Sequence, residues 1–552
     1  MQIVIPMSGT GERFLKAGYK IPKPLLQVDG KPIIAHVIDL FPGETDFLFI
    51  CNRLHLENPD FDLRGVLKKY CPDGKIVSIE PHKKGPVYAV MQAADYIKDE
   101  EPIIVNYCDF SCYWDYKDFK KFVVQSKCDG AIPSYRNFHP HSLGSTYYAY
   151  LKESEGWVTD IQEKKPYTDT PMREFASSGT YYFSSGKMVR KYFKLVMERD
   201  LNINGEYYVS LAYKAMLEEC SVAVYELEHF MQWGTPKDLE EYLVWSKTFE
   251  ELVHASPVRE RPQGTILLPM AGLGKRFADE GYDKTKPLIE VSGRSMVVQA
   301  VSDLPLGENY VFVLRQEMSG VDAIKKELES HFQNCQFKVL ESLTEGQAST
   351  CLMGMNESIR EPLTIGACDM GARYSIKAFE GLLEDPEVDI IVWAASGHPD
   401  ATRKPEMYGW ILTDENGLIQ NVSVKKPIGN PSKDYIVTGT FTFKNPEHFI
   451  SSAKRMISLD SRVNGEFYVD SCINDAIQLG YRCKVFLVDH YISWGTPSDL
   501  RTYEYWQSCF HKYSNHIYKL DEDREIPREK VANLAKRFQP TFLFRPSKKA
   551  DD

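Results

Sequence analysis

Short apolar runs occur along the chain at intervals that suit strands alternating with helices. Each half opens on such a run, at 3–5 and at 266–268, which passes directly into a glycine-rich turn and a helix-like stretch. In the first half further runs follow at 46–50, 75–79 and 103–105, separated by segments long enough for a crossover helix. The pattern predicts an α/β fold with a mostly parallel, mixed sheet flanked by helices.

Beyond these runs the chain becomes rich in aromatic residues with alternating polarity. The segments 146–150 and 180–183 are examples, and we interpret them as strands of a substrate-facing part of the sheet. Aromatic residues at alternating positions are also common in ordinary sheets, so these strands alone do not indicate a pocket.

Four separated motifs occur twice, in the same order and with nearly constant spacing. The pairs are 6–25 with 269–288, Asp109 with Asp369, 204–206 with 464–466, and 233–236 with 494–497. A period of roughly 260 residues is far longer than the roughly 20 to 50 residues of a solenoid unit. We therefore interpret the chain as a tandem duplication of whole domains.

The repeat predicts the domain boundaries. They are a first domain at 1–250, a linker at 251–263, a second domain at 264–515 and a charged C-terminal extension at 516–552. The linker is rich in prolines and charges, which suits a connecting segment. The extension has no counterpart in the first half, and the sequence indicates no function for it.

Composition and charge narrow the class of protein. The hydrophobic fraction of 43% and charged fraction of 26% are those of a globular protein, and a formal charge of −11 argues against nucleic acid or an anionic membrane as partner. The 12 cysteines lack CxxC spacing, which indicates reduced thiols rather than disulfides or zinc sites. With no signal peptide or long apolar run, we expect a cytoplasmic protein without membrane insertion. The oligomeric state is not indicated.

A glycine-rich turn follows the first strand of each half. The residues are Ser8, Gly9, Thr10 and Gly11 in the first half and Ala271, Gly272, Leu273 and Gly274 in the second. Such a turn before a helix presents backbone N–H groups to a phosphate chain. A dinucleotide fingerprint would need a glycine where Phe14 and Phe277 stand, and a P-loop would need Gly-Lys-Ser/Thr. Neither alternative fits.

Two cations follow the turn in each half. Arg13 or Arg276 lies beside it, and Lys23 or Lys286 opens a Lys-Pro-Leu triplet. This order resembles the signature of the sugar-phosphate nucleotidyltransferases, or nucleotide-diphospho-sugar pyrophosphorylases, over about 250 residues in each half. The resemblance implies two Rossmann-like, GT-A-like domains. It also implies that the arginines hold the β and γ phosphates of an NTP, while the lysines bridge the α-phosphate and the incoming phosphate.

The resemblance also implies a metal site. Asp109 and Asp369 each follow a buried strand, where the family's aspartate coordinates the catalytic Mg²⁺, with Mn²⁺ as an alternative, although an aspartate there can also cap a helix. The family usually has a second aspartate two residues before Gly-Thr-Pro, and this chain has Gln232 and Ser493 instead. Other residues that could complete the shell are Glu226, Glu228 and Asp489, or water.

The segment that reads the base differs between the halves. Gln347, after Gly346, matches the family's Gly-Gln-Ala pattern, whereas Gly85 is followed by Pro86. A glutamine amide can pair with a base edge and a proline cannot. The halves therefore select different nucleotides, or the first reads its base through backbone groups.

The acceptor side is expected from further matches to the family. By resemblance it consists of Glu163, Lys164, Gly179 and Glu206 in the first half and of Lys425, Gly439 and Glu466 in the second. Lys164 and Lys425 would contact the acceptor phosphate, although a lysine pair is more often a solvated face. Glu163, a sugar-hydroxyl ligand in the family, is replaced by Val424 in the second half.

We expect a Mg²⁺-dependent enzyme that joins an NTP to a sugar 1-phosphate, giving an NDP-sugar and pyrophosphate. Family analogy suggests capsule or other surface-glycan precursor synthesis. One alternative is a cytidylyltransferase for phosphocholine or another small phosphorylated acceptor, because aromatic residues can cage a quaternary ammonium. Another makes one half a nucleotide- or sugar-binding regulatory module. A glycosyltransferase would need Asp-x-Asp where Tyr107 and Ala367 stand. Nucleotide and acceptor are not identified.

Overall fold

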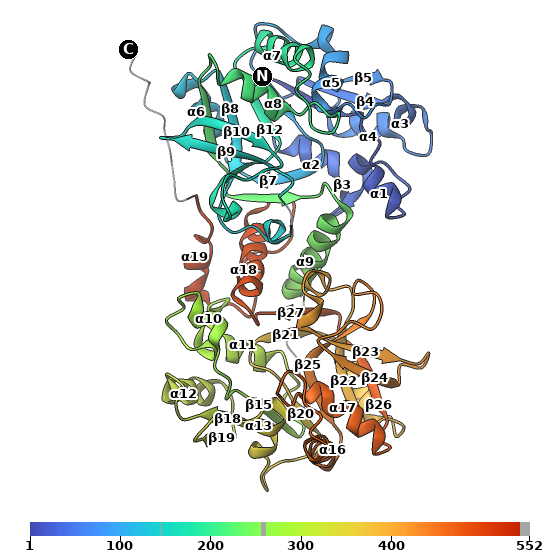
Figure 1. Ribbon diagram of the computed structural model, residues 1–552, viewed down its shortest axis with the longest axis vertical. Helices are drawn as coiled ribbons and strands as arrows, with labels where there is room; N and C mark the ends of the chain where they lie inside the picture. Colours follow the sequence, from blue (N-terminus) through green and yellow to red (C-terminus); the bar gives the residue numbers. More distant parts are fainter. Residues whose placement is uncertain (145, 255–260, 541–552) are drawn as a thin grey trace. The chain divides into compact units, whose positions relative to one another are not determined.

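The computed structural model of the chain describes residues 1–144, 146–254 and 261–540 (Figure 1). Its internal contacts divide the chain into two compact units. The first unit contains Met1–Ser246, Ser508–His516 and the segment that begins at Lys536, and the second contains Lys247–Gln507 and Ile517–Ala535. The chain therefore passes between the units four times, and the expected extension from residue 516 is divided between them.

A ten-stranded mixed sheet forms the centre of the described part of the first unit. In spatial order its strands are β11 (Phe175–Ser177), β9 (Ala149–Ser154), β10 (Trp157–Glu163), β13 (Val222–Glu226), β8 (Gly130–Tyr135), β12 (Thr180–Phe183), β6 (Ile103–Asn106), β1 (Gln2–Met7), β4 (Phe47–Asn52) and β5 (Lys75–Ile79). The strands β6, β1, β4 and β5 run parallel, and β12 is antiparallel to β6.

The apolar runs of the sequence lie in the parallel part of this sheet. Ile3, Val4 and Ile5 are fully buried because β1 lies between β4 and β6 and is covered on both faces. The runs at 46–50, 75–79 and 103–105 coincide with β4, β5 and β6. The prediction of an α/β protein with a mixed, mostly parallel sheet is confirmed.

Helices of the first unit pack against this sheet (Figure 1). They are α1 (Glu12–Lys16), α2 (Ile33–Asp39), α3 (Arg53–Glu57), α4 (Leu63–Tyr70), α5 (Gly85–Gln92), α6 (Tyr116–Ser126), α7 (Gly186–Glu198), α8 (Val209–Met216) and the start of α9 (Pro236–His254). Val87 of α5, Phe193 of α7 and Tyr213 of α8 share one core cluster with Val4. A small sheet joins β7 (Phe110–Tyr113) to β14 (His229–Gln232).

The second unit repeats the central strand order of the first. In space its strands are β19 (Cys335–Leu340), β18 (Asn309–Arg315), β15 (Thr265–Pro269), β20 (Leu363–Ile365), β25 (Tyr435–Phe443), β22 (Ile390–Ala395) and β26 (Cys483–Leu487), while β23 (Gly409–Thr413) pairs with β25 and with β24 (Ile419–Val424). A small sheet joins β21 (Met370–Arg373) to β27 (His490–Ser493). The strand order of the large sheet, from β19 to β26, matches the order β5-β4-β1-β6-β12-β8-β13 in the first unit, strand for strand.

Helices cover both faces of the second sheet. They are α10 (Lys275–Asp279), α11 (Met296–Ser302), α12 (Val321–His331), α13 (Gln347–Gly354), α14 (Ile376–Glu384), α15 (Pro399–Arg403), α16 (Pro446–Ser458), α17 (Val469–Gln478), α18 (Pro497–Lys512) and α19 (Val531–Leu534), of which α18 ends in the first unit. Along β15, Leu267 joins the core of α13, α16 and α17, whereas Ile266 and Leu268 join that of α11 and α12. Alternate residues of a strand point to opposite faces, which explains the division.

Two expected segments differ in the structure. Only the end of 146–150 is strand, because Tyr147 and Tyr148 precede β9, and the Tyr147 ring, which is 60% exposed, lies beneath the Arg13 guanidinium. Part of the expected linker is helical, since α9 continues to His254, and residues 255–260 lie outside the described residues. Among the described helices, none has the length and apolar character needed to cross a membrane.

The segment 508–516 is built into the first unit through a buried hydrogen-bond network. His36 Nε2 lies 2.8 Å from Val28 O, and His36 Nδ1 lies 2.6 Å from the Tyr513 hydroxyl. Burial lowers the pKa of His36, so the ring is neutral. A carbonyl can only accept, so Nε2 donates to Val28 and Nδ1 accepts from Tyr513. Ser111 donates a further hydrogen bond to the same hydroxyl.

Candidate active site

The glycine-rich turn of the first unit forms one wall of a cavity of about 430 Å³. Gly11 has a φ of 68° and ends the turn where α1 begins, which is a conformation that glycine adopts without strain. Side-chain atoms built onto Gly9 or Gly11 would meet nothing within 4 Å, so the space above the turn is open. The backbone of Ser8–Gly11 can therefore be approached closely by a ligand.

Lys23 and Asp109 meet in this cavity. The short helix Lys23–Leu25 buries its proline and leucine, which holds the lysine in position. Lys23 Nζ donates to Asp109 Oδ2 at 2.8 Å. Burial alone would lower the pKa of Lys23, but attraction to Asp109 outweighs it and the pKa is raised. Lys23 is thus a permanent cation beside a strand-end carboxylate.

Most residues that the sequence assigns to nucleotide and metal in the first half line this one cavity. They are Ser8, Gly9, Thr10, Gly11, Arg13, Lys23, Gly85 and Asp109, together with Glu206 from the acceptor set. Gly85 has a φ of 82°, and a Cβ there would lie 2.7 Å from the backbone of Tyr207, so only glycine fits between α5 and the 204–208 segment. The fold brings together segments that are far apart in the sequence.

A second cavity, of about 190 Å³, adjoins the first and shares Arg13, Asp109 and Tyr208 with it. It is lined by the remaining acceptor residues Glu163, Lys164 and Gly179. The two cavities meet where the Arg13 and Asp109 side chains lie. A ligand in either cavity therefore lies next to the same cation and the same carboxylate.

Lys164, which the sequence analysis assigns to the acceptor, is held by a chain of hydrogen bonds that sequence reasoning missed. Lys164 Nζ donates to the Tyr208 hydroxyl at 2.5 Å, and Tyr208 donates to Glu206. In the second unit Lys425 donates to the Tyr468 hydroxyl at 2.9 Å, and Tyr468 bonds Glu466. The signal was present, because each tyrosine stands two residues after the glutamate of the repeated Asn-Gly-Glu motif.

Glu163 is also anchored. Its Oε2 accepts a hydrogen bond of 2.6 Å from Ser210, the second residue of α8. Burial raises the pKa of Glu163, while the Ser210 hydroxyl and the Lys164 ammonium oppose the rise. A carboxylate that is buried and held by one hydroxyl keeps further lone pairs for a ligand in the cavity.

His82 is a further residue that the sequence analysis overlooked. Its Nε2 lies 3.0 Å from the buried Ser8 hydroxyl, and its ring packs on Tyr88 of α5. The position has Leu343 in the second half, so no repeated motif marks it. His82 links the phosphate turn to the segment expected to read the base.

The second unit assembles its corresponding residues in the same way. Lys286 Nζ donates to Asp369 Oδ2 at 2.5 Å and to Gly495 O at 3.2 Å, and the aspartate raises the pKa of Lys286 against the opposing effect of burial. The turn Ala271–Gly274 separates β15 from α10, and Arg276 follows it. Gln347 begins α13, and a Cβ on Gly439 would lie 2.5 Å from the Met370 side chain.

Donor chemistry at Asp109 and Asp369 suits a hard divalent cation. In the first unit a Cβ on Gly234 would lie 2.9 Å from Asp109 Oδ2 and 3.0 Å from the Gln232 amide nitrogen, so Asp109 and Gln232 lie on the same side of this glycine. In the second unit a Cβ on Gly495 would likewise lie 3.3 Å from Asp369 Oδ2 and 3.5 Å from the Ser493 hydroxyl. The residues that replace the family's second aspartate thus flank the first. The Asp109 and Asp369 carboxylates, with the Ser493 hydroxyl in the second unit, are oxygen donors that fit Mg²⁺, which takes its other ligands from phosphate and water.

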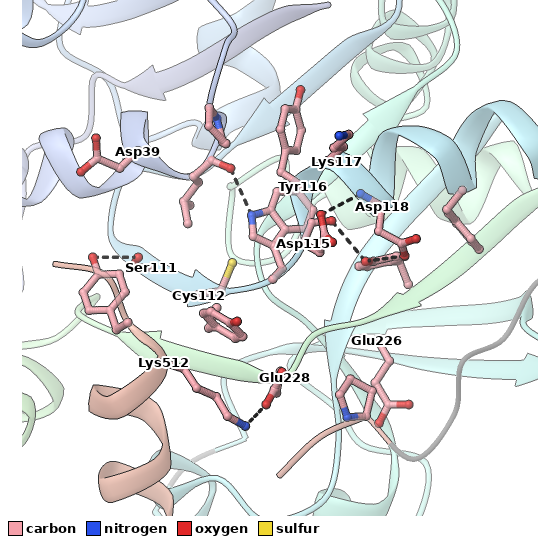
Figure 2. Close-up of a pocket in the computed structure, with 18 of the residues that line it drawn as sticks. Asp39, Ser111, Cys112, Asp115, Tyr116, Lys117, Asp118, Glu226, Glu228 and Lys512 are labelled. Carbon is pink, nitrogen blue, oxygen red and sulfur yellow. Dashed lines mark hydrogen bonds and ion pairs between the residues drawn. The ribbon is translucent and has the colours of Figure 1, made fainter. Parts of the chain in front are cut away.

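A larger cavity of about 750 Å³ lies elsewhere in the first unit (Figure 2). Its acidic residues are Asp39, Asp115, Asp118, Glu226 and Glu228. Several of these charges already have partners, since Lys512 pairs with Glu228 and Arg136 pairs with Glu226. Of the residues named from the sequence, only Glu226 and Glu228, offered there as alternative metal ligands, line it, and neither lines the cavity that contains Asp109. The lining of the larger cavity comes from segments as distant as 36 and 515, which explains why no motif revealed it.

The comparison with known families concerns the first unit. Residues 3–241 match the family described as "Nucleotidyl transferase". Over these residues the chain is similar to the nucleotidyl transferase family. The match includes the glycine-rich turn, Arg13, Lys23, Asp109 and the acceptor cavity described above. The second unit lies outside the matched residues.

Individual relatives are distant. The chain is 25% identical to the "Bifunctional protein GlmU" of Methanocaldococcus jannaschii over 44% of this chain and 53% of that protein. It is 25% identical to a "Mannose-1-phosphate guanyltransferase" of Schizosaccharomyces pombe over 43% of this chain and 62% of that protein. It thus spans just over half the length of these relatives. The solved inositol-1-phosphate CTP transferase from T. maritima is 18% identical, with a TM-score of 0.34, over 44% of this chain and 94% of that one.

Proposed function

We propose that each unit joins a nucleoside triphosphate to a sugar 1-phosphate, giving an NDP-sugar and pyrophosphate. The observation that carries the proposal is the junction of two cavities at Arg13 and Asp109, with Lys23 in one and Lys164 in the other. Two phosphorylated substrates can lie side by side there, with a cation at each phosphate. Such neutralisation is what attack of one phosphate on another requires.

The reaction needs positioning more than covalent help. An oxygen of the acceptor phosphate attacks the α-phosphorus, the bond from that phosphorus to the bridging oxygen breaks, and pyrophosphate leaves with the electron pair. The backbone of Ser8–Gly11 and the Arg13 guanidinium hold the β and γ phosphates. Lys23 offsets the charge that gathers between the α-phosphate and the acceptor. No covalent intermediate with the protein is required.

The acceptor is a sugar phosphate in this proposal. Lys164 binds its phosphate and is aimed by Tyr208, while Glu163 and Glu206 accept hydrogen bonds from sugar hydroxyls. Carboxylates suit the vicinal hydroxyls of a sugar. The NDP-sugar would serve as a donor for glycosyl transfer, for example into surface glycans.

Asp109 and Asp369 would hold Mg²⁺, which when bound supplies positive charge and orients the triphosphate. The second unit carries the same set, with Arg276, Lys286 and Lys425 in the same roles. Gln347 would read the base there, whereas the first unit, with Pro86, would use backbone groups. The two units therefore form two tandem GT-A-like transferase domains with distinct nucleotide choice.

Pyrophosphate release tests the proposal. Full-length protein, Lys23→Ala and Lys286→Ala are assayed with Mg²⁺, each of the four NTPs and a panel of sugar 1-phosphates that also includes phosphocholine. We expect each variant to lose about 100- to 1,000-fold in rate for one set of substrate pairs and to keep the other. The exposed lysines Lys20 and Lys284 supply matched controls as Lys20→Ala and Lys284→Ala.

The outcomes separate the alternatives. Release with CTP and phosphocholine alone would replace the sugar acceptor by a choline acceptor. A silent Lys286→Ala variant would assign the second unit to binding or regulation. Absence of release from the full-length protein with every pair would refute the nucleotidyltransferase proposal.

A further inference from the structure

The second unit lacks the acceptor carboxylate on its strand. Glu163 is the last residue of β10, and its counterpart at the end of β24 is Val424. The equivalence is structural as well as sequential, because Glu163 pairs with Ala149 on β9 and Val424 pairs with Gly409 on β23. A pocket that binds sugar hydroxyls in the first unit would thus meet an apolar side chain here.

A carboxylate enters the same region from the opposite side. Ser210, which donates to Glu163, is the second residue of α8, and the second residue of α17 is Asp470. In the first unit the strand therefore carries the acid and the helix carries the hydroxyl. In the second unit the helix carries the acid and the strand carries none.

A third position changes in step with these two. A Cβ on Gly409 would lie 2.4 Å from Asp470 Oδ2, so the carboxylate occupies the space that a side chain at 409 would need. The first unit has Ala149 there and Ser210 opposite. The triplet Ala149, Glu163, Ser210 is thus replaced as a set by Gly409, Val424, Asp470.

We propose that Asp470 binds the sugar hydroxyls of the acceptor in the second unit, in the role that Glu163 has in the first. The acid would reach the sugar from the helix and on a side chain one carbon shorter, so the second unit selects a sugar with a different arrangement of hydroxyls. This inference rests on the proposed function of the second unit.

The surroundings of Asp470 support a ligand-binding role over a purely structural one. First-turn aspartates commonly stabilise a helix from an exposed position. Asp470 is instead held against a strand glycine, and burial raises its pKa to about 6, against the opposing effects of its own N–H and of Lys425. Glu163 stands in the same relation to Lys164. Each carboxylate therefore accompanies the lysine assigned to the acceptor phosphate.

The test uses full-length protein carrying Lys23→Ala, so that only the second unit turns over. Into it we introduce Asp470→Asn and, separately, the set Gly409→Ala, Val424→Glu and Asp470→Ser, which restores the arrangement of the first unit. Asp475→Asn on the same helix is the matched control, because its burial also raises a carboxyl pKa and its partner is Arg455. Initial rates of pyrophosphate release give KM for NTP and for each sugar 1-phosphate.

We expect Asp470→Asn to raise the acceptor KM about 10- to 100-fold, with the NTP KM changed less than about twofold. The triple variant should recover turnover and shift its preference towards the sugar 1-phosphate used by the first unit. An unchanged acceptor KM in Asp470→Asn, with the Lys23→Ala parent active, would overturn this inference alone. A parent inactive with every pair would overturn the proposed function of the second unit and the inference with it.

Discussion

Lys164 and Lys425 share a backbone conformation that lysine rarely adopts. Their φ angles are 59° and 62°, in the left-handed region, and each side chain donates to a tyrosine hydroxyl that in turn bonds a glutamate. This conformation costs a residue with a Cβ about 1 to 2 kcal/mol. Its recurrence at the same motif in both units indicates that it aims the ammonium group rather than stabilising the fold.

The tyrosine that orients Lys164 can be tested alone. Tyr208→Phe removes the hydroxyl without changing the ring, so the lysine loses the group that directs it. We expect the acceptor KM of the first unit to rise about 3- to 10-fold while the NTP KM stays constant. Tyr207→Phe, which alters the neighbouring tyrosine, serves as the control in the same steady-state assay. Equal effects of both changes would argue against an orienting role.

The raised pKa of Asp470 predicts that its carboxylate lowers the unfolding free energy of the protein at neutral pH. Its pKa is raised to about 6 from an ordinary value near 4, so between about pH 4 and 6 the unfolded chain releases a proton that the folded chain keeps. Stability therefore falls with rising pH through this window and stays reduced above it. Asp470→Asn should be more stable than the parent at pH 8 by roughly 1 to 3 kcal/mol, with the difference vanishing near pH 4.

Urea denaturation at pH 4, 6 and 8 measures this difference. The unfolding free energy of Asp470→Asn should equal that of the parent at pH 4 and exceed it most at pH 8. A variant that is destabilised at pH 8 would show that the carboxylate contributes to the fold itself.

At the scale of elements, the helix that follows Gly346 packs closely against the second Asn-Gly-Glu segment. Gly346 has a φ of 136°, and a Cβ there would lie 2.4 Å from Phe467 N, while Ala348 N donates to Phe467 O at 2.9 Å. This packing joins the start of α13 to the 464–468 segment. We expect the joint to couple the nucleotide and acceptor sides of the proposed site.

Gly346→Ala would force this joint apart. We expect a loss of roughly 1 to 3 kcal/mol in unfolding free energy and weaker NTP binding by the second unit, because the backbone conformation and the close approach both exclude a Cβ. Gly381→Ala is the matched control, since a Cβ there meets nothing within 4 Å inside α14, and it should stabilise by about 0.5 to 1 kcal/mol. Equal effects in urea denaturation would contradict the packing argument.

Strands that are buried on both faces are the easiest to predict from sequence. The runs in β1, β4 and β6 are apolar without alternation because both faces are covered, whereas β5, at the edge of the sheet, is partly exposed and contains Lys75 and Ser78. Of the expected strand at 146–150 only Ala149 and Tyr150 are strand, because the Tyr147 ring packs against Arg13 outside the sheet. Motif repetition located the cations and carboxylates. The sequence showed that Val424 replaces Glu163, but the accompanying changes at Gly409 and Asp470 could not be linked to it without strand register and helix position.

At the scale of the whole molecule, the two compact units do not coincide with the two sequence repeats. The first unit needs residues 508–516, and Tyr513 supplies the donor to the buried His36. Tyr513→Phe should lower the unfolding free energy by roughly 1 to 2 kcal/mol, because it leaves a buried nitrogen without its partner. Tyr96→Phe, at an exposed tyrosine, is the control, and urea denaturation followed by tryptophan fluorescence measures both. Similar midpoints for the two variants would refute the role of this contact.

Because the first unit contains residues from beyond the second repeat, the two repeats cannot be freely separated at the level of the gene. A gene split between the two sequence repeats would encode a first product without Tyr513, whose position lies more than 260 residues beyond the end of the first unit's main segment. The second repeat therefore cannot be lost together with the residues that follow it without removing part of the first unit. If both proposed sites are active, a change of specificity in one must therefore arise within a single chain that also carries the other.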